Sequence, residues 1–242
     1  MPPLGAPGPY PHRGTARRPP TSPLMKNDLM INSRWFRAKA CRLVLMLLLG
    51  ALALAACHGR AQDWKDADKL ATLLNWKAGS VVAEIGAGDG GLTLAAAERV
   101  GPTGRVYTTE LDPNKLAKLE SLAAAQKAHN IIAVKAGEAK TNLPRECCDS
   151  IFMRRVYHHL TQPAKEDASL FQSLKPGGLL AVIDQLPQEG TKPPKGVPKN
   201  RGGHGMPKQL LIEELSAAGF QVLTTPTSWH GEEYCLVFRK PN

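Results

Sequence analysis

Aromatic residues are scarce in this 242-residue chain, at 5% of the total. Because aromatic rings are what stack on unpaired bases, this scarcity argues against a surface for single-stranded nucleic acid. Cysteine is scarce as well, with five residues, too few for a scaffold built on disulfides. Hydrophobic residues nevertheless make up 43% of the chain, which excludes a wholly disordered protein and allows one ordinary domain with a tail.

Positive charge is concentrated near the N-terminus. The chain carries 31 Lys and Arg against 21 Asp and Glu, a formal charge of +10. Residues 1–56 hold eight of the basic residues and a single acid, Asp28, whereas residues 57–242 hold 23 basic and 20 acidic residues. The high net charge therefore belongs mostly to the N-terminal segment, and no nucleic-acid partner is expected.

Two segments precede the predicted folded domain. Residues 1–33 begin with a stretch rich in Pro, Gly and Arg that cannot bury a core, so they are predicted to be disordered, or untranslated with Met25 or Met30 as the start. Residues 34–57 carry a basic flank followed by the 14 small or apolar residues of 43–56. A membrane span needs about 20 such residues, whereas a short run behind a basic flank is typical of a signal peptide.

The apolar run ends in Leu54-Ala55-Ala56-Cys57, which resembles the lipobox of bacterial lipoproteins. The resemblance implies that Cys57 is lipidated, becomes the new N-terminus and anchors the protein to a membrane on the periplasmic side of the cell envelope. An uncleaved membrane anchor or a buried apolar helix is the alternative, and a buried helix of this kind needs protein on every side. A chain that is not exported would remain in the cytoplasm.

From residue 61 onward, helical and strand-like segments alternate, which predicts a mainly parallel sheet with helices on both faces. The expected fold is α/β: a doubly wound sheet of seven strands with a C-terminal antiparallel pair, formed by residues 61–242. Asp112 followed by Pro113 is a typical helix start. The predicted strands lie at 81–85, 105–110, 130–135, 149–153, 179–184, 220–225 and 234–239.

A glycine-rich loop follows the first predicted strand, at the sheet edge where ligands bind in folds of this kind. Glycine there allows the backbone to approach a ligand closely and to adopt positive φ. On spacing alone, Gly86, Gly88 and Gly91 match the dinucleotide fingerprint G-x-G-x-x-G, although a plain tight turn would give the same pattern.

The loop and its surroundings match a second pattern. Residues 84–90 read E-I-G-A-G-D-G, which resembles motif I of class I S-adenosylmethionine-dependent methyltransferases. The later landmarks of that family follow in order over about 61–240: Glu110 ending the second strand, Gly137-Glu138 after the third, Asp149 opening the fourth, Leu174-Lys175-Pro176-Gly177-Gly178 before the fifth, and Ala218-Gly219-Phe220 before the last pair.

The resemblance implies a Rossmann-like methyltransferase fold with S-adenosylmethionine as the cofactor. The loop backbone would pass beneath the methionine part of the cofactor, and Glu84 would help to hold that end. Glu110 would accept both ribose hydroxyls, as a carboxylate with two oxygens can. The remaining cofactor contacts implied are Gly86, Ala87, Gly88 and Gly90 of the loop, Leu111 and Glu138 around the adenine, and Arg154 after the fourth strand.

The segment 153–160 follows the fourth predicted strand and would face the transferred methyl group. It resembles an apolar-His-His-Leu stretch of many small-molecule methyltransferases, so a small-molecule methyl acceptor is expected. Tyr157, His158 and His159 are the catalytic candidates, because their side chains can take or share a proton, histidine especially. Packing of the histidines within the loop is the alternative. No metal is expected, since adjacent histidines rarely point at one ion.

Two further groups of residues leave their roles open. Loop 186–205 carries Lys192, Lys195, Lys199 and Arg201, and is interpreted as a lid, a clamp for an anionic substrate, or a solvated loop. The doublet Cys147-Cys148 and the single Cys235 are expected to be buried and reduced.

Two other function classes compete with a methyltransferase. An NAD(P)-dependent oxidoreductase of the short-chain type should carry Tyr-x-x-x-Lys, but Leu111, Thr161 and Phe238 stand four residues beyond the tyrosines of the domain. A non-catalytic envelope protein that binds a ligand on a methyltransferase fold is the other alternative, because a fold does not fix function. Export favours this non-catalytic hypothesis, because S-adenosylmethionine is made in the cytoplasm whereas a lipoprotein is exported.

Overall fold

The computed structural model describes residues 61–224 and 227–242. The predictions of a disordered extension at 1–33, a signal peptide at 34–57 and lipidation at Cys57 lie outside these residues. Among the residues that the structure describes, no helix combines the length and the apolar character that crossing a bilayer requires.

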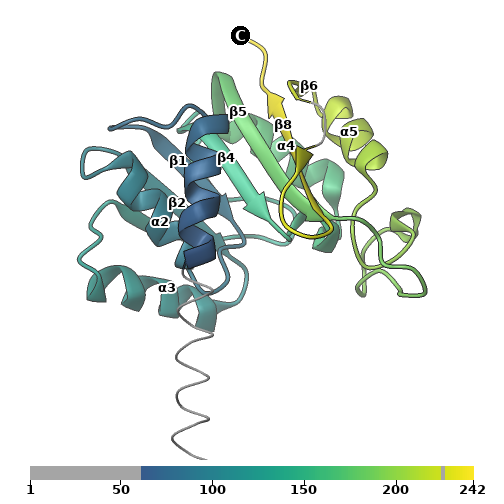
Figure 1. The fold of residues 1–242 in the computed structure, drawn as a ribbon, viewed down its shortest axis with the longest axis horizontal. Coiled ribbons are helices and arrows are strands. Elements are labelled where there is room, and N and C mark those ends of the chain that lie inside the picture. The colour runs from purple at the N-terminus through teal and green to yellow at the C-terminus, as the bar shows by residue number, and fades with distance from the viewer. Residues whose placement is uncertain (1–60, 225–226) are drawn as a thin grey trace, which may run out of the picture. The chain divides into compact units, whose positions relative to one another are not determined.

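One eight-stranded sheet forms the centre of the domain, in the order β3-β2-β1-β4-β5-β8-β6, with β7 also paired to β8 (Figure 1). The first five strands in this order are parallel, and β8 runs antiparallel to β5. The predicted α/β class, the mainly parallel sheet and the C-terminal antiparallel pair are confirmed. The strands are β1 Val81–Ile85, β2 Arg105–Glu110, β3 Ile131–Lys135, β4 Cys148–Arg154, β5 Leu174–Gln185, β6 Gln221–Val222, β7 Thr227–Ser228 and β8 Glu233–Arg239.

The sheet differs from the predicted one at two places. The strand expected at 220–225 is the two-residue β6, and the two-residue β7 pairs with β8 separately, giving eight strands instead of seven. Pro226 stands between the two in the sequence and has no N–H to donate to a ladder. Strand β5 begins at Leu174, before the predicted 179–184, so the L-K-P-G-G segment is part of the strand, with a register shift against β4.

Helices cover both faces of the sheet, as the alternating pattern predicts. The side chain of Asp112 accepts a hydrogen bond from the Asn114 backbone N–H at 2.8 Å and caps the helix that Pro113 opens. The first helical segment of the described chain, residues 61–73, is called the leading helix below. The other helices are α2 Gly91–Val100, α3 Pro113–Ala125, α4 Pro163–Ser173 and α5 Lys208–Ala217, with short 3-10 turns η1 Tyr157–His159 and η2 Lys199–Arg201.

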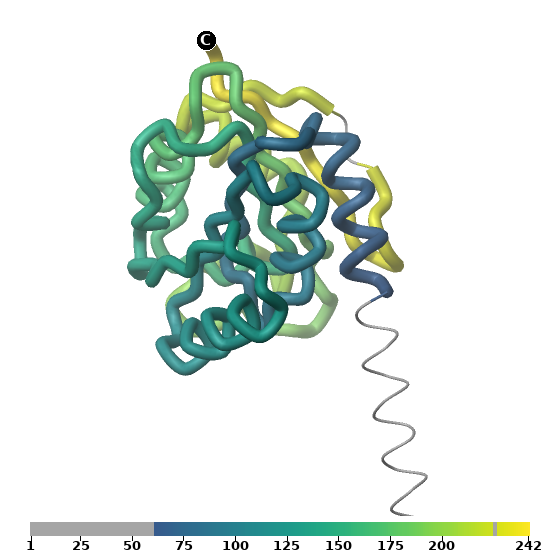
Figure 2. Tube along the Cα trace, turned by 90° about the vertical axis from the view of Figure 1, so that its left-hand side faces the viewer, coloured from purple at the N-terminus to yellow at the C-terminus, as the bar shows by residue number. Residues whose placement is uncertain are grey.

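The core consists of two clusters, one on each face of the sheet. Alternate strand residues such as Val82 and Phe152 pack with the leading helix and α2, and their neighbours Ala83 and Ile151 pack with α4 and α5. Figure 2 shows the leading helix beside the C-terminal segment that contains β7 and β8. The Lys69 ammonium donates to the Trp229 backbone oxygen at 3.4 Å across this contact. The leading helix is therefore an integral part of the domain.

The cysteine doublet departs from its prediction. Cys147 and Cys148, adjacent at the start of β4, are joined by a disulfide, so the expectation that they are reduced is wrong. Cys235 on β8 is free and buried, as expected, and burial raises the pKa of its thiol to about 12.

Candidate active site

The glycine loop connects β1 to α2 at the carboxyl edge of the sheet. The Gly86 backbone N–H donates to the Thr109 oxygen at 3.0 Å, which fixes the start of the loop against the end of β2. Gly86 has a φ of 69°, and a Cβ there would come within 2.7 Å of the Val156 side chain. Gly90 has a φ of 81°, and a Cβ there would come within 2.5 Å of Leu119. Both positions therefore require glycine, because the loop is left-handed and closely packed.

Glu110 ends β2 beside this loop, and its carboxylate is 8% exposed. One oxygen accepts from the Gly88 N–H at 3.2 Å, and the other accepts from the Leu111 N–H at 2.8 Å and, more weakly, from that of Asp112 at 3.3 Å. A carboxylate has about four acceptor positions, so one remains for an additional donor. Leu111 is 55% exposed and is the most exposed large hydrophobic residue of the described chain. Glu110 and Leu111 therefore place a polar group beside an apolar surface, and a nucleoside could use the first for its sugar hydroxyls and the second for its base.

Glu84 lies inside β1 and is almost fully buried. Its carboxyl accepts a hydrogen bond from the Thr93 hydroxyl at the start of α2. Burial raises the pKa of Glu84 to about 8, against the lowering effects of the Thr93 hydrogen bond and the nearby Arg154 charge. At neutral pH the side chain is therefore mostly a neutral acid, held under the glycine loop.

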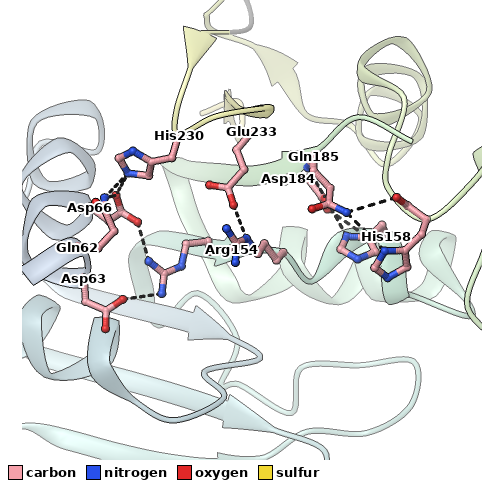
Figure 3. Close-up of polar contacts among 11 residues, drawn as sticks. Gln62, Asp63, Asp66, Arg154, His158, Asp184, Gln185, His230 and Glu233 are labelled. Carbon is pink, nitrogen blue, oxygen red and sulfur yellow. Dashed lines mark hydrogen bonds and ion pairs between the residues drawn. The ribbon is translucent and has the colours of Figure 1, made fainter. Parts of the chain in front are cut away.

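Arg154 ends β4 and binds two carboxylates of the leading helix (Figure 3). One guanidinium nitrogen lies 2.6 Å from an oxygen of Asp63, and another lies 2.6 Å from an oxygen of Asp66. Burial alone would raise the pKa of Asp66, but hydrogen bonds from His230 and Arg154 outweigh it and lower that pKa. The guanidinium contacts shown by the structure thus attach the leading helix to the site. A contact between Arg154 and the cofactor remains a prediction.

The two acids of the leading helix are residues that the sequence analysis missed. Asp63 also lies against the glycine loop, because a Cβ on Gly91 would come within 2.1 Å of its carboxylate. Two acids three residues apart in a helix lie on one face, and this spacing is the one signal in the sequence that could have pointed to them. The spacing does not identify Arg154 as their partner. The fold was needed to bring β4 beneath that face.

His158 lies in η1, directly after β4, and its ring is held by Asp184 at the end of β5 (Figure 3). The Nδ1 atom lies 2.6 Å from one oxygen of Asp184, and the backbone N–H of His158 donates to the other oxygen at 3.1 Å. The Nε2 atom is buried and has no hydrogen-bond partner among the residues that the structure describes. The fold therefore orients this ring and leaves one nitrogen available.

His159 and His204 extend the group. The His159 ring centre lies 4.1 Å from that of His158, and the His204 ring centre lies 4.8 Å from it, edge-on. Partial burial lowers the pKa of His159, and the neighbouring His158 and His204 lower it further. His204 comes from loop 186–205, and the sequence analysis did not select it because nothing in its local sequence points to the segment after β4.

Tyr157 is the third catalytic candidate, and its role in catalysis stays a prediction. Its ring is fully buried, and its hydroxyl lies 2.9 Å from Asp167 and 3.0 Å from Glu214. Burial and these two acids raise the pKa of the phenol far above its ordinary value. The hydroxyl has a single proton and can donate to only one of the two carboxyl groups. Burial raises the pKa of Asp167 to about 7, so its carboxyl can be protonated and donate the second hydrogen bond to the hydroxyl. Tyr157 therefore ties η1 to α4 and α5.

Arg201 and Glu138 complete the set of predicted positions. Arg201 is fully buried and binds Glu214 at 2.8 Å, so this residue is part of the core and not of a solvated basic loop. Glu138 is exposed in the turn closed by the bridge between Gly137 and Lys140 beyond β3. Its predicted contact with adenine stays a prediction.

Comparisons with known proteins agree with this geometry. Residues 83–182 match the family model described as a methyltransferase domain. A ubiquinone/menaquinone biosynthesis C-methyltransferase from Marinomonas sp. is 29% identical over 109 residues, which are 45% of this chain and 43% of that protein. The chain thus spans less than half the length of this curated relative.

Solved structures support the fold. An S-adenosylmethionine-dependent methyltransferase from Aquifex aeolicus superposes with a TM-score of 0.61 at 23% identity, over 72% of this chain and 89% of that one. A phosphoethanolamine N-methyltransferase from Haemonchus contortus, solved in complex with S-adenosylmethionine, superposes with a TM-score of 0.59 at 14% identity, over 74% of this chain and 53% of that one. These likenesses show that the chain has the fold of the two methyltransferase structures.

Proposed function

We propose that this protein transfers the methyl group of S-adenosylmethionine to a small molecule. The observation that carries the proposal is the Glu110 carboxylate, bonded to the Gly88 N–H of the glycine loop and flanked by the exposed Leu111. A carboxylate at this point keeps one acceptor position for a ribose hydroxyl, and an exposed leucine beside it can pack on a purine. The family match of residues 83–182 and the fold support the same cofactor.

The reaction asks for positioning more than for covalent chemistry. The nucleophile of the acceptor forms a bond to the methyl carbon, the bond from that carbon to sulfur breaks, and its electron pair returns to sulfur. A sulfonium charge is lost in the process, so a site that aligns the two reactants provides much of the acceleration. An acceptor O–H or N–H must also lose its proton, which requires a group able to receive it.

Segment 154–160 is the proposed wall of the acceptor site. It follows β4, which pairs with β1 and β5, and loops at this edge converge on the crevice where ligands bind in open α/β sheets. His158 and His159 remain the predicted contacts to the acceptor, and His204 joins them in this group. The glycine loop contacts the segment directly, because Gly86 packs against Val156.

Export as a lipoprotein anchored at Cys57 is part of the proposal. Its support is the order of basic flank, short apolar run and lipobox in residues 34–57.

Binding of the cofactor by residues 59–242 tests the proposal. These residues lie within the compact unit of residues 56–242. Calorimetric titration with S-adenosylmethionine should show binding near one equivalent, and NADH should not compete. Absence of binding would remove the methyltransferase proposal, and tight NADH binding would favour the oxidoreductase. Binding without turnover on any acceptor of a broad screen would favour a non-catalytic envelope protein.

A further inference from the structure

The geometry points to a divalent transition-metal site of the Zn²⁺ type formed by His158, His159 and His204. Their ligand nitrogens all lie within 4.8 Å of one another, and they form the one group of this composition found among the described residues. From the sequence no metal is expected, because only two of the three histidines are neighbours in the chain. Imidazole nitrogen is a preferred ligand of zinc, and three histidines are an established zinc-binding set.

The fold brings the three rings together through two neighbouring strands. His158 and His159 follow β4, and His204 belongs to the loop that leaves β5, the parallel neighbour of β4. The His204 backbone N–H donates to the Thr191 hydroxyl at 2.8 Å. Its carbonyl oxygen accepts from the Gln185 side chain at 3.3 Å. Two hydrogen bonds therefore position His204: one within its own loop, to Thr191, and one to Gln185 at the end of β5.

His158 has the environment of a metal-bound histidine. Ligating histidines commonly donate the second ring N–H to a carboxylate, which fixes the ring and raises its basicity. Asp184 occupies that position, with its oxygen 2.6 Å from Nδ1, and it is itself fully buried. A buried ring nitrogen without a hydrogen-bond partner destabilises the folded state. The Nε2 atom of His158 is such a nitrogen among the described residues, and a metal ion would satisfy it.

The rings can close to bonding distance with small movements. A tetrahedral ion with bonds of about 2.0–2.1 Å to nitrogen needs its ligand atoms roughly 3.4 Å apart. The present upper separation of 4.8 Å therefore has to shrink. His158 is fixed by Asp184, whereas His159 is exposed and His204 is half-buried, so the latter two can turn toward it.

Three histidines leave a fourth coordination position open. Catalytic zinc sites use such a position for water or substrate, and structural ones fill it with a fourth protein ligand. The open position would lie on the acceptor wall, which rests on the proposed function, and an oxygen or nitrogen of the acceptor is the chemistry that fits it. Binding of the metal itself does not depend on that role.

Metal titration tests the site without any measurement of turnover. Residues 59–242 exclude His58 and are used without an affinity tag, after removal of metal with a chelator. Calorimetry with Zn²⁺ should show one equivalent, and Co²⁺ should give the visible absorption of a tetrahedral complex. His204→Ala and His159→Ala, both outside the core, should abolish the equimolar phase. His129→Ala, an exposed histidine elsewhere, is the matched control and should leave it unchanged.

The outcomes separate this proposal from the previous one. Absence of an equimolar zinc phase, or a phase that survives His204→Ala, would overturn the metal site. Melting curves of each variant show whether it is folded, and the same samples are titrated with S-adenosylmethionine. Cofactor binding without zinc binding overturns the metal site alone, whereas zinc binding without cofactor binding counts against the methyltransferase alone. Turnover that needs His158 in metal-free protein would assign direct proton transfer to it and would overturn the role of the open coordination position in binding the acceptor.

Discussion

The Nδ1 atom of His158 lies 2.6 Å from an oxygen of Asp184, and the two side chains are 2% and 0% exposed. Two backbone N–H groups, those of His158 and Gln185, donate to the same carboxylate at 3.1 and 2.8 Å. A buried carboxylate with this many donors is held in one orientation, and it holds the ring in turn.

Asp184→Asn should therefore weaken zinc binding by about 10–100-fold, the range for loss of a carboxylate behind a ligating histidine. The amide keeps the shape of the side chain but loses its charge. Competition with a chromophoric chelator measures the affinity. Asp68→Asn, at an exposed acid paired with Arg99, is the control. Equal zinc affinity in Asp184→Asn and the unchanged protein would show that the carboxylate has no part in metal binding.

Glu110→Ala should weaken binding of S-adenosylmethionine by about 1.5–3 kcal/mol, the range for a lost hydrogen bond to a charged group. Calorimetric titration gives the affinity. Glu138→Ala removes a carboxylate that is exposed in the structure and should cost less. A larger loss at Glu138 than at Glu110 would reverse the roles assigned to these two acids.

The stability of the ligand-free domain should fall as the pH rises from 5 to 9. When the pKa of a carboxyl is higher in the folded state than in the unfolded state, its protonation favours folding. This contribution to the free energy of unfolding is complete below the unfolded-state pKa and is lost as the pH rises through the folded-state pKa. For Glu84 these values are 4.5 and about 8. Glu166 and Asp167, with pKa values raised by burial to about 7, act in the same direction.

Glu84→Gln should flatten this pH dependence, because an amide does not titrate. Melting temperatures at several pH values measure the effect, and Glu98→Gln at an exposed position of α2 is the control. If Glu84 contacts the amino group of the cofactor, binding near neutral pH should also release protons, which calorimetry in buffers of different ionisation enthalpy detects. Parallel pH profiles for Glu84→Gln and the unchanged protein would show that Glu84 does not titrate in this range.

Arg154→Met should destabilise the domain by about 1.5–3 kcal/mol, because the buried Asp66 loses a charged donor but keeps its hydrogen bond to His230. Asp66 is fully buried and receives one of the two guanidinium hydrogen bonds. Chemical denaturation measures the loss. Arg99→Met, which breaks the exposed pair with Asp68, should cost about 0–1 kcal/mol. Similar losses in the two variants would mean that the leading helix is not held by Arg154.

Lipidation of Cys57 is tested on protein isolated from the membranes of a bacterial host. Mass spectrometry should find a diacylglycerol on Cys57 and no peptide from residues 1–56, and Cys57→Ser should abolish the modification. A soluble product that retains residues 43–56 would contradict the lipoprotein proposal.

The sequence predicted the parallel strands and the glycine loop because their signals are local. Short, mainly apolar runs such as Val81–Ile85, followed by glycine, are typical of buried strands. The segment around Pro226 was predicted less well, since its short strands lack an alternating pattern and pair only with β8.

The candidate site was predictable where one motif contains its residues, as in Glu84, the glycine loop and Glu110. It was not predictable where partners lie far apart in the chain. Arg154 finds Asp63 and Asp66 through packing of the leading helix, and His158 finds Asp184 through pairing of β4 with β5. Likewise, the sequence motif does not reveal that the Tyr157 hydroxyl is buried between Asp167 and Glu214.

Strand β8 is the last described strand in the chain, yet it lies within the sheet, with β5 on one side and β6 and β7 on the other. A growing polypeptide therefore exposes the edge of β5 until residues 233–239 have been synthesised. Pairings between distant segments form slowly, since the entropy of closing the loop between them is lost first. The order of synthesis thus delays completion of the core until β8 has been made, after all the other strands of the described sheet.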